Sequence, residues 1–358
     1  MKAVVLVGGS GTRLRPLTLA LPKQMLPVAE VPMIQRVLAH LAENGVTDAV
    51  LSLGYRHEAF LEALPGARTL GLHVTSVIET EPLGTGGALG FAARTAGVDE
   101  RFVAVNGDVL TDLDLGALVD FHVERGAEGT LALTPVDDSS PFGLVATDED
   151  GRVLEFVEKP AAAQPGLVNA GTYVLEPSVL ERIPENRPVS IEREVFPAIA
   201  AEGSLYAMVS STYWTDTGTP ERFLRCQLEL IQGRRPGPPA PGAHHRGDGV
   251  WTIGSAVIDG EVQGPALIGT AAYVQSGATV ERSVIGAGAR VHEGARVRES
   301  VLLPGAVVRA DATVELSLVG EQAVVGEKAS LSGITVVGPN VEVEAGAHLH
   351  GVRLPGDD

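Results

Sequence analysis

Residues 4–18 read VVLVGGSGTRLRPLT, an apolar run that ends in a glycine-rich turn. Such a run is typical of a short buried strand, and the glycines after it let backbone N–H groups converge on a phosphate because no Cβ blocks the approach. Two common phosphate-binding motifs do not match this stretch. The dinucleotide fingerprint needs a glycine where Leu14 stands, and the P-loop needs a Gly-Lys-Ser/Thr sequence. The stretch therefore predicts a phosphate-binding turn of another kind.

The surrounding sequence, up to about residue 230, alternates strand-like apolar runs with segments of helical period. In residues 33–44 the apolar side chains fall on one helical face, and Asn44-Gly45 ends the helix. Further strands are expected at residues 49–53, 102–105, 130–133 and 173–175. This alternation predicts an α/β domain with a mostly parallel sheet over residues 1–231.

Beyond residue 249 the sequence acquires a period of six. Aliphatic residues recur in five successive triplets, which gives turns of 17 to 18 residues. An α-helix or an ordinary strand does not have this period, whereas a hexapeptide β-helix points one aliphatic side chain inward on each of three flat faces. Residues 250–358 are therefore predicted to form a left-handed parallel β-helix. The triplets are Ile268, Val274 and Val280; Ile285, Val291 and Val297; Leu302, Val308 and Val314; Val319, Val325 and Leu331; Val337, Val343 and Leu349.

Residues 232–249 (QGRRPGPPAPGAHHRGDG) have the composition of a linker. The prolines disfavour helix and sheet, and the glycines oppose packing. His244 and His245 lie in this segment; a histidine pair is able to bind a metal ion, but a solvated linker is the expected state. The chain is thus expected to contain two domains joined by a linker, which agrees with a length of 358 residues.

The composition limits the class of protein. A net charge of −18 argues against a non-specific nucleic-acid binder, since phosphate backbones need clustered Lys and Arg, but it leaves a nucleotide substrate open. No apolar run approaches the roughly 20 residues that span a bilayer, and the first apolar run is too short for a signal peptide. Cys226 is the single cysteine, which leaves no intrachain disulfide. A cytoplasmic protein with no membrane or nucleic-acid partner is expected.

The glycine-rich stretch reads GGxGTRLxPLT and is followed by Pro22-Lys23, which resembles the signature of the sugar-1-phosphate nucleotidylyltransferases. This family includes the mannose-1-phosphate guanylyltransferases and the glucose-1-phosphate thymidylyl- and adenylyltransferases. The resemblance implies a Rossmann-like nucleotidyltransferase domain whose turn holds a triphosphate between two cations. The implied residues are Gly8, Gly9, Gly11 and Thr12, with Arg13 and Lys23 as the cations.

Two cations in these positions would stabilise the charge that spreads over the phosphoryl oxygens in the transition state. The alternative for Arg13 and Lys23 is a solvated surface pair. Gln24 departs from the family pattern, which often has proline after Pro-Lys, and this departure puts little in doubt.

Two aspartates indicate a metal site. Asn106-Gly107-Asp108 follows an apolar run, and the C-terminal ends of parallel strands are where α/β sheets bind ligands. Mg²⁺ prefers one or two carboxylates together with phosphate oxygens and water. A WxDxGT segment at residues 214–219 offers Asp216, and the resemblance implies that the aspartates matching Asp108 and Asp216 bind the metal ion. The alternative for each aspartate is a helix N-cap.

Residues 79–87 read ETEPLGTGG and precede a helix of small residues. The matching segment of the family reads the base, which implies nucleotide contacts for Glu79, Gly84 and Thr85. A glutamate is able to accept hydrogen bonds from the N1–H and the N2 amine of guanine, and guanylyltransferases of the mannose-1-phosphate type have a similar E-x-P-L-G-T-[AG]-G segment. GTP is therefore the expected nucleotide. The alternative is that Glu79 and Glu81 are only solvated.

Four more stretches, at residues 142–143, 158–160, 169–171 and 190–197, resemble family positions that bind the sugar phosphate. Without the resemblance, charged residues near a proline favour an exposed loop. The resemblance implies contacts with sugar hydroxyls or with the sugar phosphate for Gly143, Glu158, Lys159, Asn169, Gly171 and Arg193.

The implied reaction is an in-line attack by a sugar 1-phosphate on the α-phosphorus of the nucleotide, which yields a nucleoside diphosphate sugar and pyrophosphate. The nucleophile is a phosphate with a second pKa of about 6, so no general base is required. Catalysis is expected from Mg²⁺, Arg13, Lys23 and alignment of the substrates. Mannose 1-phosphate is the expected sugar; glucose 1-phosphate, a heptose or cyclitol phosphate, and the nucleotides dTTP, UTP and ATP stay open.

Three other functions stay open. The β-helix would be a second enzyme if it acted as an acyltransferase, for which His292, His348 and His350 are candidates; a structural role in a homo-oligomer is expected instead. The second alternative is a non-catalytic regulatory subunit, although such subunits typically lose loop or metal residues that are present here. The third is a metal-dependent glycosyltransferase, but those enzymes lack the GGxGTR loop.

Overall fold

The computed structural model describes residues 1–54, 56–61, 70–185 and 187–356, and the contacts within it divide the chain into two compact units. The first, here called the sheet unit, comprises Met1–Gly9 and Ile34–Trp214. The second, here called the solenoid unit, comprises Ser10–Met33 and Thr215–Asp358. The boundary falls inside the glycine-rich turn. Residues 10–33 and 215–231 therefore group with the β-helix, whereas the sequence pattern placed them in a domain spanning residues 1–231.

The centre of the sheet unit is parallel and is built around the strand of the opening stretch. β1 (Lys2–Leu6) pairs in parallel with β4 (Asp48–Leu53) and with β6 (Phe102–Asn106), and β4 pairs in parallel with β5 (His73–Ile78). The side chains in the middle of β1 are fully buried, as expected for a strand covered on both faces. The C-terminal ends of these strands lie at one edge of the sheet, which is the edge that binds ligands in α/β folds.

The other half of this sheet is largely antiparallel, a feature that the sequence pattern did not indicate. β11 (Gly166–Leu175) pairs antiparallel with β6, β8 (Gly129–Val136) and β9 (Gly143–Thr147), and β9 pairs antiparallel with β10 (Val153–Glu158). β12 (Leu205–Val209) is the exception, because it runs parallel to β8. The parallel α/β core is thus as predicted, and the antiparallel extension carries the later motifs.

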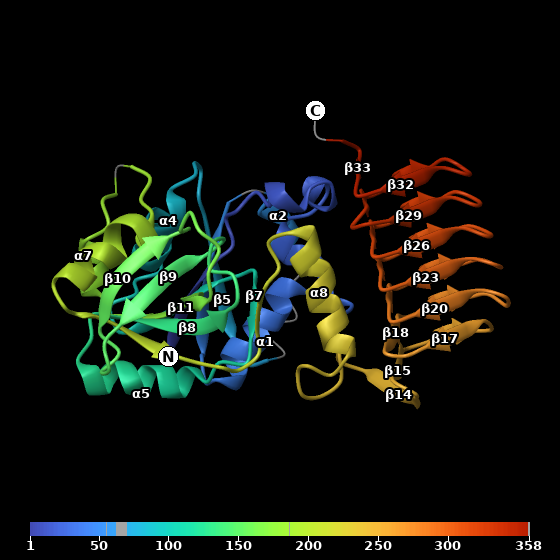
Figure 1. Ribbon diagram of the computed structural model, residues 1–358. Coiled ribbons are helices and arrows are strands. Elements are labelled where there is room, and N and C mark those ends of the chain that lie inside the picture. The colour runs from blue at the N-terminus through green and yellow to red at the C-terminus, as the bar shows by residue number, and fades with distance from the viewer. Residues whose placement is uncertain (55, 62–69, 186, 357–358) are drawn as a thin grey trace. The chain divides into compact units, whose positions relative to one another are not determined.

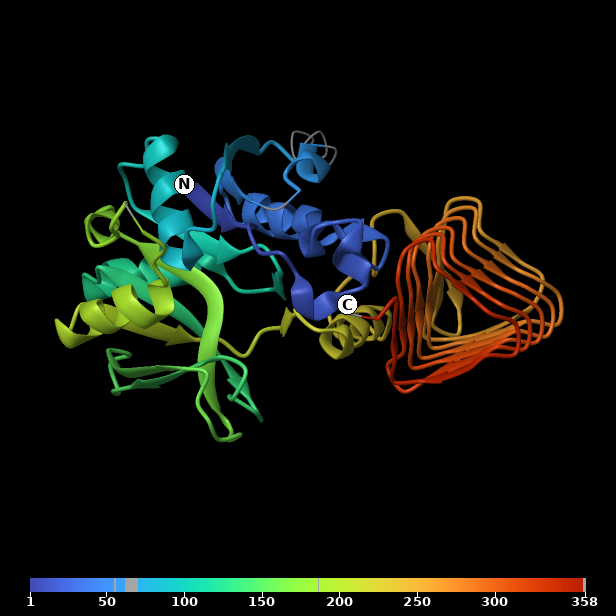
Figure 2. The same ribbon diagram turned by 90° about the horizontal axis from the view of Figure 1, so that it is seen from above.

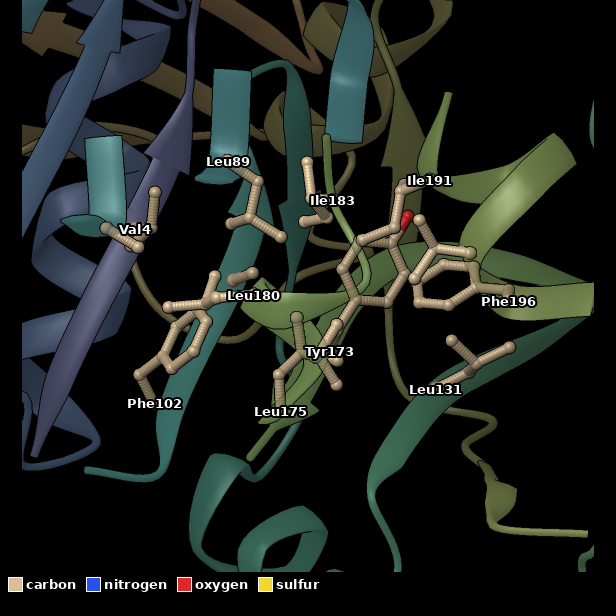
Figure 3. Packing of buried hydrophobic residues seen from close by; sticks show 14 of the residues in the cluster. Val4, Leu89, Phe102, Leu131, Tyr173, Leu175, Leu180, Ile183, Ile191 and Phe196 are labelled. Carbon is tan, nitrogen blue, oxygen red and sulfur yellow. The ribbon is translucent and has the colours of Figure 1, made fainter. Parts of the chain in front are cut away.

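Helices cover this sheet, and one of them, α1 (Met33–Glu43), was predicted from its apolar face. The other helices that the structure describes in the sheet unit are α2 (Glu58–Leu61), α4 (Gly84–Thr95), α5 (Leu115–Arg125), α6 (Ser178–Glu181), the π-helix η4 (Ile191–Val195) and α7 (Phe196–Ala201). Figure 3 shows the core between α4, η4 and the sheet, where Tyr173 meets Phe196 edge to face at 5.0 Å between ring centroids. Such a pair adds about 0.5–1.5 kcal/mol to the burial of its two rings. No helix in the described ranges is both long and apolar enough to cross a bilayer.

The β-helix of the solenoid unit has the three parallel faces that the period of six predicted, and Figure 2 shows its triangular section. Successive turns are offset by 17 residues, as Leu267, Val284 and Val301 pair in parallel, and by 18 at the later step from Leu318 to Val336. The inward aliphatic side chains of the triplets form one core, and most are fully buried.

The strands of the three faces follow in sheet order. The first face contains β14 (Ala243–Gly247), β15 (Val250–Ile253), β18 (Ala266–Ile268), β21 (Val284–Ile285), β24 (Val301–Leu302), β27 (Leu318–Val319), β30 (Val336–Val337) and β33 (Arg353–Leu354). The second contains β16 (Val257–Ile258), β19 (Tyr273–Val274), β22 (Arg290–Val291), β25 (Val307–Val308), β28 (Val324–Val325) and β31 (Glu342–Val343). The third contains β17 (Glu261–Gln263), β20 (Thr279–Glu281), β23 (Arg296–Arg298), β26 (Thr313–Glu315), β29 (Ser330–Ser332) and β32 (His348–His350).

The end of the predicted linker, residues 232–249, forms a strand, although most of its residues are exposed to solvent as expected. Strand β14 lies in this segment and pairs antiparallel with β15 (Figure 1). The ring of His245 packs on Trp251 at 4.9 Å between centroids. The prolines that disfavour a strand stand at residues 236–241, before β14 begins, so the sheet is able to extend to residue 243.

The remainder of the solenoid unit is the segment from Ser10 to Met33 together with α8 (Pro220–Ile231). The segment contains three short 3₁₀ turns, η1 (Thr12–Leu14), η2 (Leu17–Leu19) and η3 (Lys23–Met25), and a hairpin of β2 (Pro27–Val28) and β3 (Val31–Pro32). Helix α8 is amphipathic and contacts both β2 and β21 of the β-helix. The hairpin, α8 and the β-helix are therefore packed as one body.

Candidate active site

Glu79 and Gly8 lie against each other at the C-terminal edge of the parallel sheet. A Cβ added to Gly8 would be 3.1 Å from Glu79 Oε1. Ser52 Oγ donates a hydrogen bond to the same carboxylate oxygen at 2.8 Å. Burial raises the pKa of Glu79, while hydrogen bonds from Ser52 and from the backbone of Leu83 oppose the rise. Glu79 is therefore an oriented, partly buried carboxylate rather than a solvated one, whereas Glu81 is exposed.

A cleft of about 600 Å³ opens beside Glu79 within the sheet unit. Leu83, Phe91 and Arg94 line it from α4 and the turn before α4, and Arg187 lines it from the segment after α6. A cleft of this volume, with an aromatic ring and several charged groups, has the character of a small-molecule site.

The Asn106-Gly107-Asp108 turn is fixed against the first strand. Gly107 N donates to Leu6 O at 2.9 Å, and a Cβ on Gly107 would collide with the side chain of Val7. Asp108 is partly buried and leads directly into the strand β7 (Val109–Thr111). The helix-cap alternative is therefore wrong for Asp108, because no helix begins there.

A bulge in β11 brings Asn169 and Gly171 to the same edge. Pairing with β8 is interrupted between Asn169 and Tyr173. Asn169 donates to the Tyr173 hydroxyl at 2.9 Å and accepts from Gly171 N at 3.0 Å. Gly171 has a φ of 74°, and a Cβ there would be 2.7 Å from Asn106 Nδ2. The bulge thus packs its backbone directly on the residue that precedes Gly107-Asp108.

Gly143 and Glu158 face each other across the β9–β10 pair. A Cβ on Gly143 would be 3.0 Å from Glu158 Oε2, so a glycine keeps this carboxylate accessible. Burial raises the pKa of Glu158, as does the charge of Glu192, and the charges of Lys159 and Arg193 lower it. Lys159 Nζ lies 3.7 Å from Glu158 Oε1 with 57% of its side chain exposed, so it is available to an anion.

Thr85 and Glu192 join the start of α4 to the π-helix η4. Thr85 Oγ1 donates to Glu192 Oε2 at 2.6 Å and accepts from Ile191 N at 3.1 Å. Ser190 Oγ donates to the same glutamate oxygen at 2.8 Å. The hydroxyl of Thr85 is therefore engaged with η4. The side chain of Arg193 is exposed on this helix, and Gly84 at the start of α4 has a φ of 72°.

In the solenoid unit the glycine-rich turn closes on itself. Gly11 adopts a φ of 64°, and a Cβ there would be 3.0 Å from the Thr18 methyl group and 3.2 Å from Lys23 Cβ. Thr18 Oγ1 donates to Gly11 O at 2.9 Å. The side chains of Thr12 and Arg13 are exposed while Leu14 is buried, so the turn presents its polar atoms outward.

Arg13 and Asp216 converge on Gly218. A Cβ on Gly218 would be 2.9 Å from Arg13 Nη2 and 3.0 Å from Asp216 Oδ1. Asp216 Oδ1 accepts from Gly218 N at 3.1 Å and from Arg222 Nη1 at 2.8 Å. Thr219 caps α8 through its hydroxyl, so the cap alternative is wrong for Asp216 as well. The carboxylate is fixed in orientation beside an exposed guanidinium.

Comparisons with known proteins identify the family. A family model described as "Nucleotidyl transferase" matches residues 2–233. The chain belongs to this family. A second model, described as "GMPPB C-terminal domain", matches residues 262–355 of this nucleotidyl transferase. The glycosyltransferase alternative is thereby set aside.

Several relatives of this nucleotidyl transferase are similar over most of their length. The mannose-1-phosphate guanylyltransferase of Mycobacterium tuberculosis is 42% identical over 285 residues, which is 79% of each chain. Mannose-1-phosphate guanylyltransferase 1 of Arabidopsis thaliana is 40% identical over 290 residues, 79% of this chain and 80% of the relative.

Solved structures resemble the transferase in fold. HddC from Yersinia pseudotuberculosis complexed with GMP-PN matches with a TM-score of 0.57 and 29% identity, covering 64% of this chain and 99% of that one. A putative glucose-1-phosphate thymidylyltransferase from Bacillus anthracis matches with a TM-score of 0.58 and 26% identity, covering 63% of this chain and 94% of that one.

The carboxylates of the transferase are compatible with a divalent metal ion that completes its shell with water and substrate oxygens. Within the described ranges, no three His, Cys, Asp or Glu side chains gather as a metal-binding group. Mg²⁺ commonly takes one or two carboxylates and completes its shell with water and substrate phosphates. Asp216, oriented by two donors, has the character of such a ligand.

Sequence reasoning missed two site residues. Arg222 holds Asp216, and Glu192 joins Thr85 to η4 and raises the pKa of Glu158. Arg222 lies in the first turn of α8, six residues after Asp216, and the WxDxGTP signal for a helix start offered a way to find it. No local pattern marks Glu192, because Thr85, the residue that it joins to η4, lies 107 residues earlier.

Proposed function

We propose that this transferase moves a guanylyl group from GTP to mannose 1-phosphate and forms GDP-mannose and pyrophosphate. Relatives at about two-fifths identity are named mannose-1-phosphate guanylyltransferases, and a structural neighbour was solved with GMP-PN. The observation that carries the proposal is the exposed Arg13 guanidinium beside Gly218 and Asp216, next to a closed glycine turn. This arrangement is suited to the triphosphate of a nucleotide.

On the nucleotide side, the backbone of Gly8, Gly9, Gly11 and Thr12 would receive the phosphates, with Arg13 and Lys23 as fixed cations. Cations fixed beside the phosphates would stabilise charge on the α-phosphoryl oxygens without reorganising. We propose Asp108 and Asp216 as ligands of Mg²⁺. When bound, Mg²⁺ supplies charge neutralisation at the phosphates.

On the sugar side, we propose that Gly143, Glu158, Asn169 and Gly171 bind the hydroxyls and that Lys159 and Arg193 bind the phosphate. Glu158 is partly buried, and the charges of Lys159 and Arg193 oppose the rise of its pKa. Its carboxylate is therefore suited to accept hydrogen bonds from hydroxyl groups. The phosphate is the nucleophile and needs no base from the chain, which agrees with a mechanism based on alignment.

Base selection is assigned to Glu79, with Gly84 and Thr85 shaping the start of α4. Ser52 orients the carboxylate of Glu79, which is able to pair with the N1–H and N2 amine of guanine and offers no complementary donor to uracil or thymine. The alternatives are another nucleoside triphosphate or another sugar or cyclitol phosphate.

The test is a panel of GTP, ATP, CTP, UTP and dTTP against mannose 1-phosphate, glucose 1-phosphate and a heptose phosphate, read by pyrophosphate release. We expect GTP with mannose 1-phosphate to give the highest kcat/KM. A higher value for another pair would reassign the substrates. Absence of turnover with every pair would favour the non-catalytic regulatory subunit, and acyl transfer by the full chain would favour the acyltransferase alternative.

We also propose that the enzyme works in the cytoplasm as a homo-oligomer assembled through the β-helix. The single cysteine, Cys226, is buried and fits a reducing compartment. Light scattering after size-exclusion chromatography would measure the assembly, and a monomeric mass at micromolar concentration would contradict it.

A further inference from the structure

The hairpin after the glycine-rich turn has an unusual residue at its tip. Ala29 and Glu30, between β2 and β3, have φ values of 43° and 71°. A two-residue hairpin with both central residues in the left-handed region favours Asn and Gly, because a Cβ is disfavoured there. A glutamate at this position therefore suggests a role for its side chain.

The side chain of Glu30 is seated on a turn of the β-helix. Its carboxylate accepts a hydrogen bond from the backbone N–H of Ala287. A Cβ added to Gly269, one turn earlier, would collide with Glu30 Oε2, so the glycine provides the space. Both contacts lie within the solenoid unit.

The surroundings of the Glu30 carboxylate are largely apolar. Burial raises the pKa of Glu30 to about 7, and the hydrogen bond from Ala287 opposes the rise. Its neighbours along the hairpin (Val28, Ala29 and Val31) and its contacts on the β-helix (Gly269 and Ala287) have no charged side chain. Among the described residues, no charged group acts on this pKa.

Gln227 of α8 holds the same hairpin from another side. Its side-chain oxygen accepts from Ala29 N at 2.6 Å, and its amide donates to Pro27 O at 2.8 Å. Gln227 is fully buried, and α8 begins just after Asp216. The helix that orients Asp216 through Arg222 therefore also holds the hairpin.

A second contact between the segment from Ser10 to Met33 and the β-helix lies at Pro16. Pro16 packs on the β-helix at Gly338, where an added Cβ would be 3.0 Å from Pro16 Cβ. Ala287 and Gly338 lie three turns apart on the β-helix, a separation of about 14 Å at the usual spacing of adjacent strands. The segment is thus fixed on the β-helix at two separate points.

Between Gly11 and Glu30 lie Arg13 and Lys23, the two cations assigned to the triphosphate. We propose that Glu30 is a positioning residue, whose contact with the β-helix holds the segment from Ser10 to Lys23 in the shape that receives GTP. The β-helix is then part of the nucleotide site, not only an oligomerisation module. This inference rests on the proposed function, because it assigns GTP to that segment.

The test compares Glu30→Gly and Glu30→Gln with the full-length wild type. Glu30→Gly relieves the left-handed backbone but removes the carboxylate. Glu30→Gln keeps the length and an acceptor for Ala287 N. Glu299→Gly is the matched control, because Glu299 also has a positive φ (46°) and its carboxylate pairs with Arg282 of the β-helix itself at 3.0 Å.

For Glu30→Gly we expect the KM for GTP to rise about tenfold, which corresponds to the loss of one hydrogen bond to a charged or buried group. The change in kcat should be smaller. Amide hydrogen exchange of residues 10–26 should accelerate, while Glu299→Gly matches the wild type. Glu30→Gln should restore the KM to within about threefold, because a neutral side chain suits the buried seat.

The pH profile adds a readout that a merely structural role would not move. Since burial favours the protonated form of Glu30, the attachment weakens as pH rises from the ordinary glutamate range through about 7. The wild-type KM for GTP should therefore rise above pH 7 relative to that of Glu30→Gln.

The proposal would be overturned if Glu30→Gly had the same KM for GTP and the same amide exchange as the wild type. A lower unfolding temperature with an unchanged KM would also overturn it, because that result would show a structural role only. If the wild type does not turn over GTP at all, the proposed function fails. In that case the exchange of residues 10–26 still decides whether Glu30 holds the segment.

Discussion

Arg222 Nη1 donates to Asp216 Oδ1 at 2.8 Å, and both side chains are about 85% buried. The pair is formed within one unit, across the turn that begins α8, so it fixes the carboxylate before any ligand arrives. Loss of a group that orients a metal ligand typically costs about 10–100-fold in metal affinity or activity.

Replacement of this arginine tests that role. We expect Arg222→Met to lower kcat/KM by about 10–100-fold and to raise the Mg²⁺ concentration for half-maximal activity, because Asp216 loses its orientation. Arg225→Met, on the exposed side of the same helix, is the control. An unchanged Mg²⁺ requirement in Arg222→Met would separate Asp216 from the metal site.

Asp108→Asn removes one proposed metal ligand while keeping the shape of the side chain. We expect turnover to fall by about 10²–10³-fold, which is the range found when one charge-stabilising group is lost. The unfolding temperature should stay near that of the wild type, because Asp108 leads into β7 and caps no helix. Asp120→Asn, at an exposed position of α5, serves as the control. Near-normal turnover in Asp108→Asn would refute the metal assignment.

Apart from β14, which lies in the predicted linker, the repeat of the β-helix could be predicted because each inward position reports burial directly. Val274, Val280 and Ile285 are fully buried on three successive faces, and the same spacing holds in the next turns. A period of six has no competing interpretation. The strand β1 and the helix α1 were predictable for the same reason, since one face or both faces of each are buried.

The missed features depend on contacts between distant segments. Glu192 meets Thr85, and Glu30 meets Ala287, and no periodicity relates the members of either pair. The β11 bulge at Asn169 also has no sequence signature, because its conformation is set by the packing of Gly171 on Asn106. Residue types could be assigned to the site from the motif, but their partners required the fold.

Glu79→Gln tests base selection through pH. Burial raises the pKa of Glu79. As the pH is lowered, kcat/KM of the wild-type enzyme for GTP should therefore begin to fall at a higher pH than it would if this glutamate were exposed. Protonation removes a hydrogen-bond acceptor, so the loss appears as pH falls. In Glu79→Gln this step should be missing from the pH profile of kcat/KM.

The same variant should reduce the preference for GTP over ITP, which lacks the N2 amine, by about 10–100-fold, the value of a hydrogen bond to a charged group. Glu81→Gln, in the same turn but exposed, should keep the wild-type preference. Equal GTP/ITP ratios in the wild type and Glu79→Gln would assign base recognition to another group.

Gly171→Ala tests whether the bulge positions the edge of the sheet. At a φ of 74° a Cβ is strained, and here it would also be 2.7 Å from Asn106 Nδ2. We expect the free energy of unfolding to fall by about 2–5 kcal/mol, the sum of left-handed strain and overpacking. Gly97→Ala isolates the strain, since Gly97 has a φ of 62° and nothing within 4 Å of an added Cβ. It should cost about 1–2 kcal/mol in urea titrations and leave activity unchanged.

Because Asn106 leads into Gly107-Asp108, Gly171→Ala should also lower kcat at a temperature where the variant remains folded. If the two variants lose equal stability and both keep full activity, Asn106 moves aside freely and the bulge does not position the aspartate.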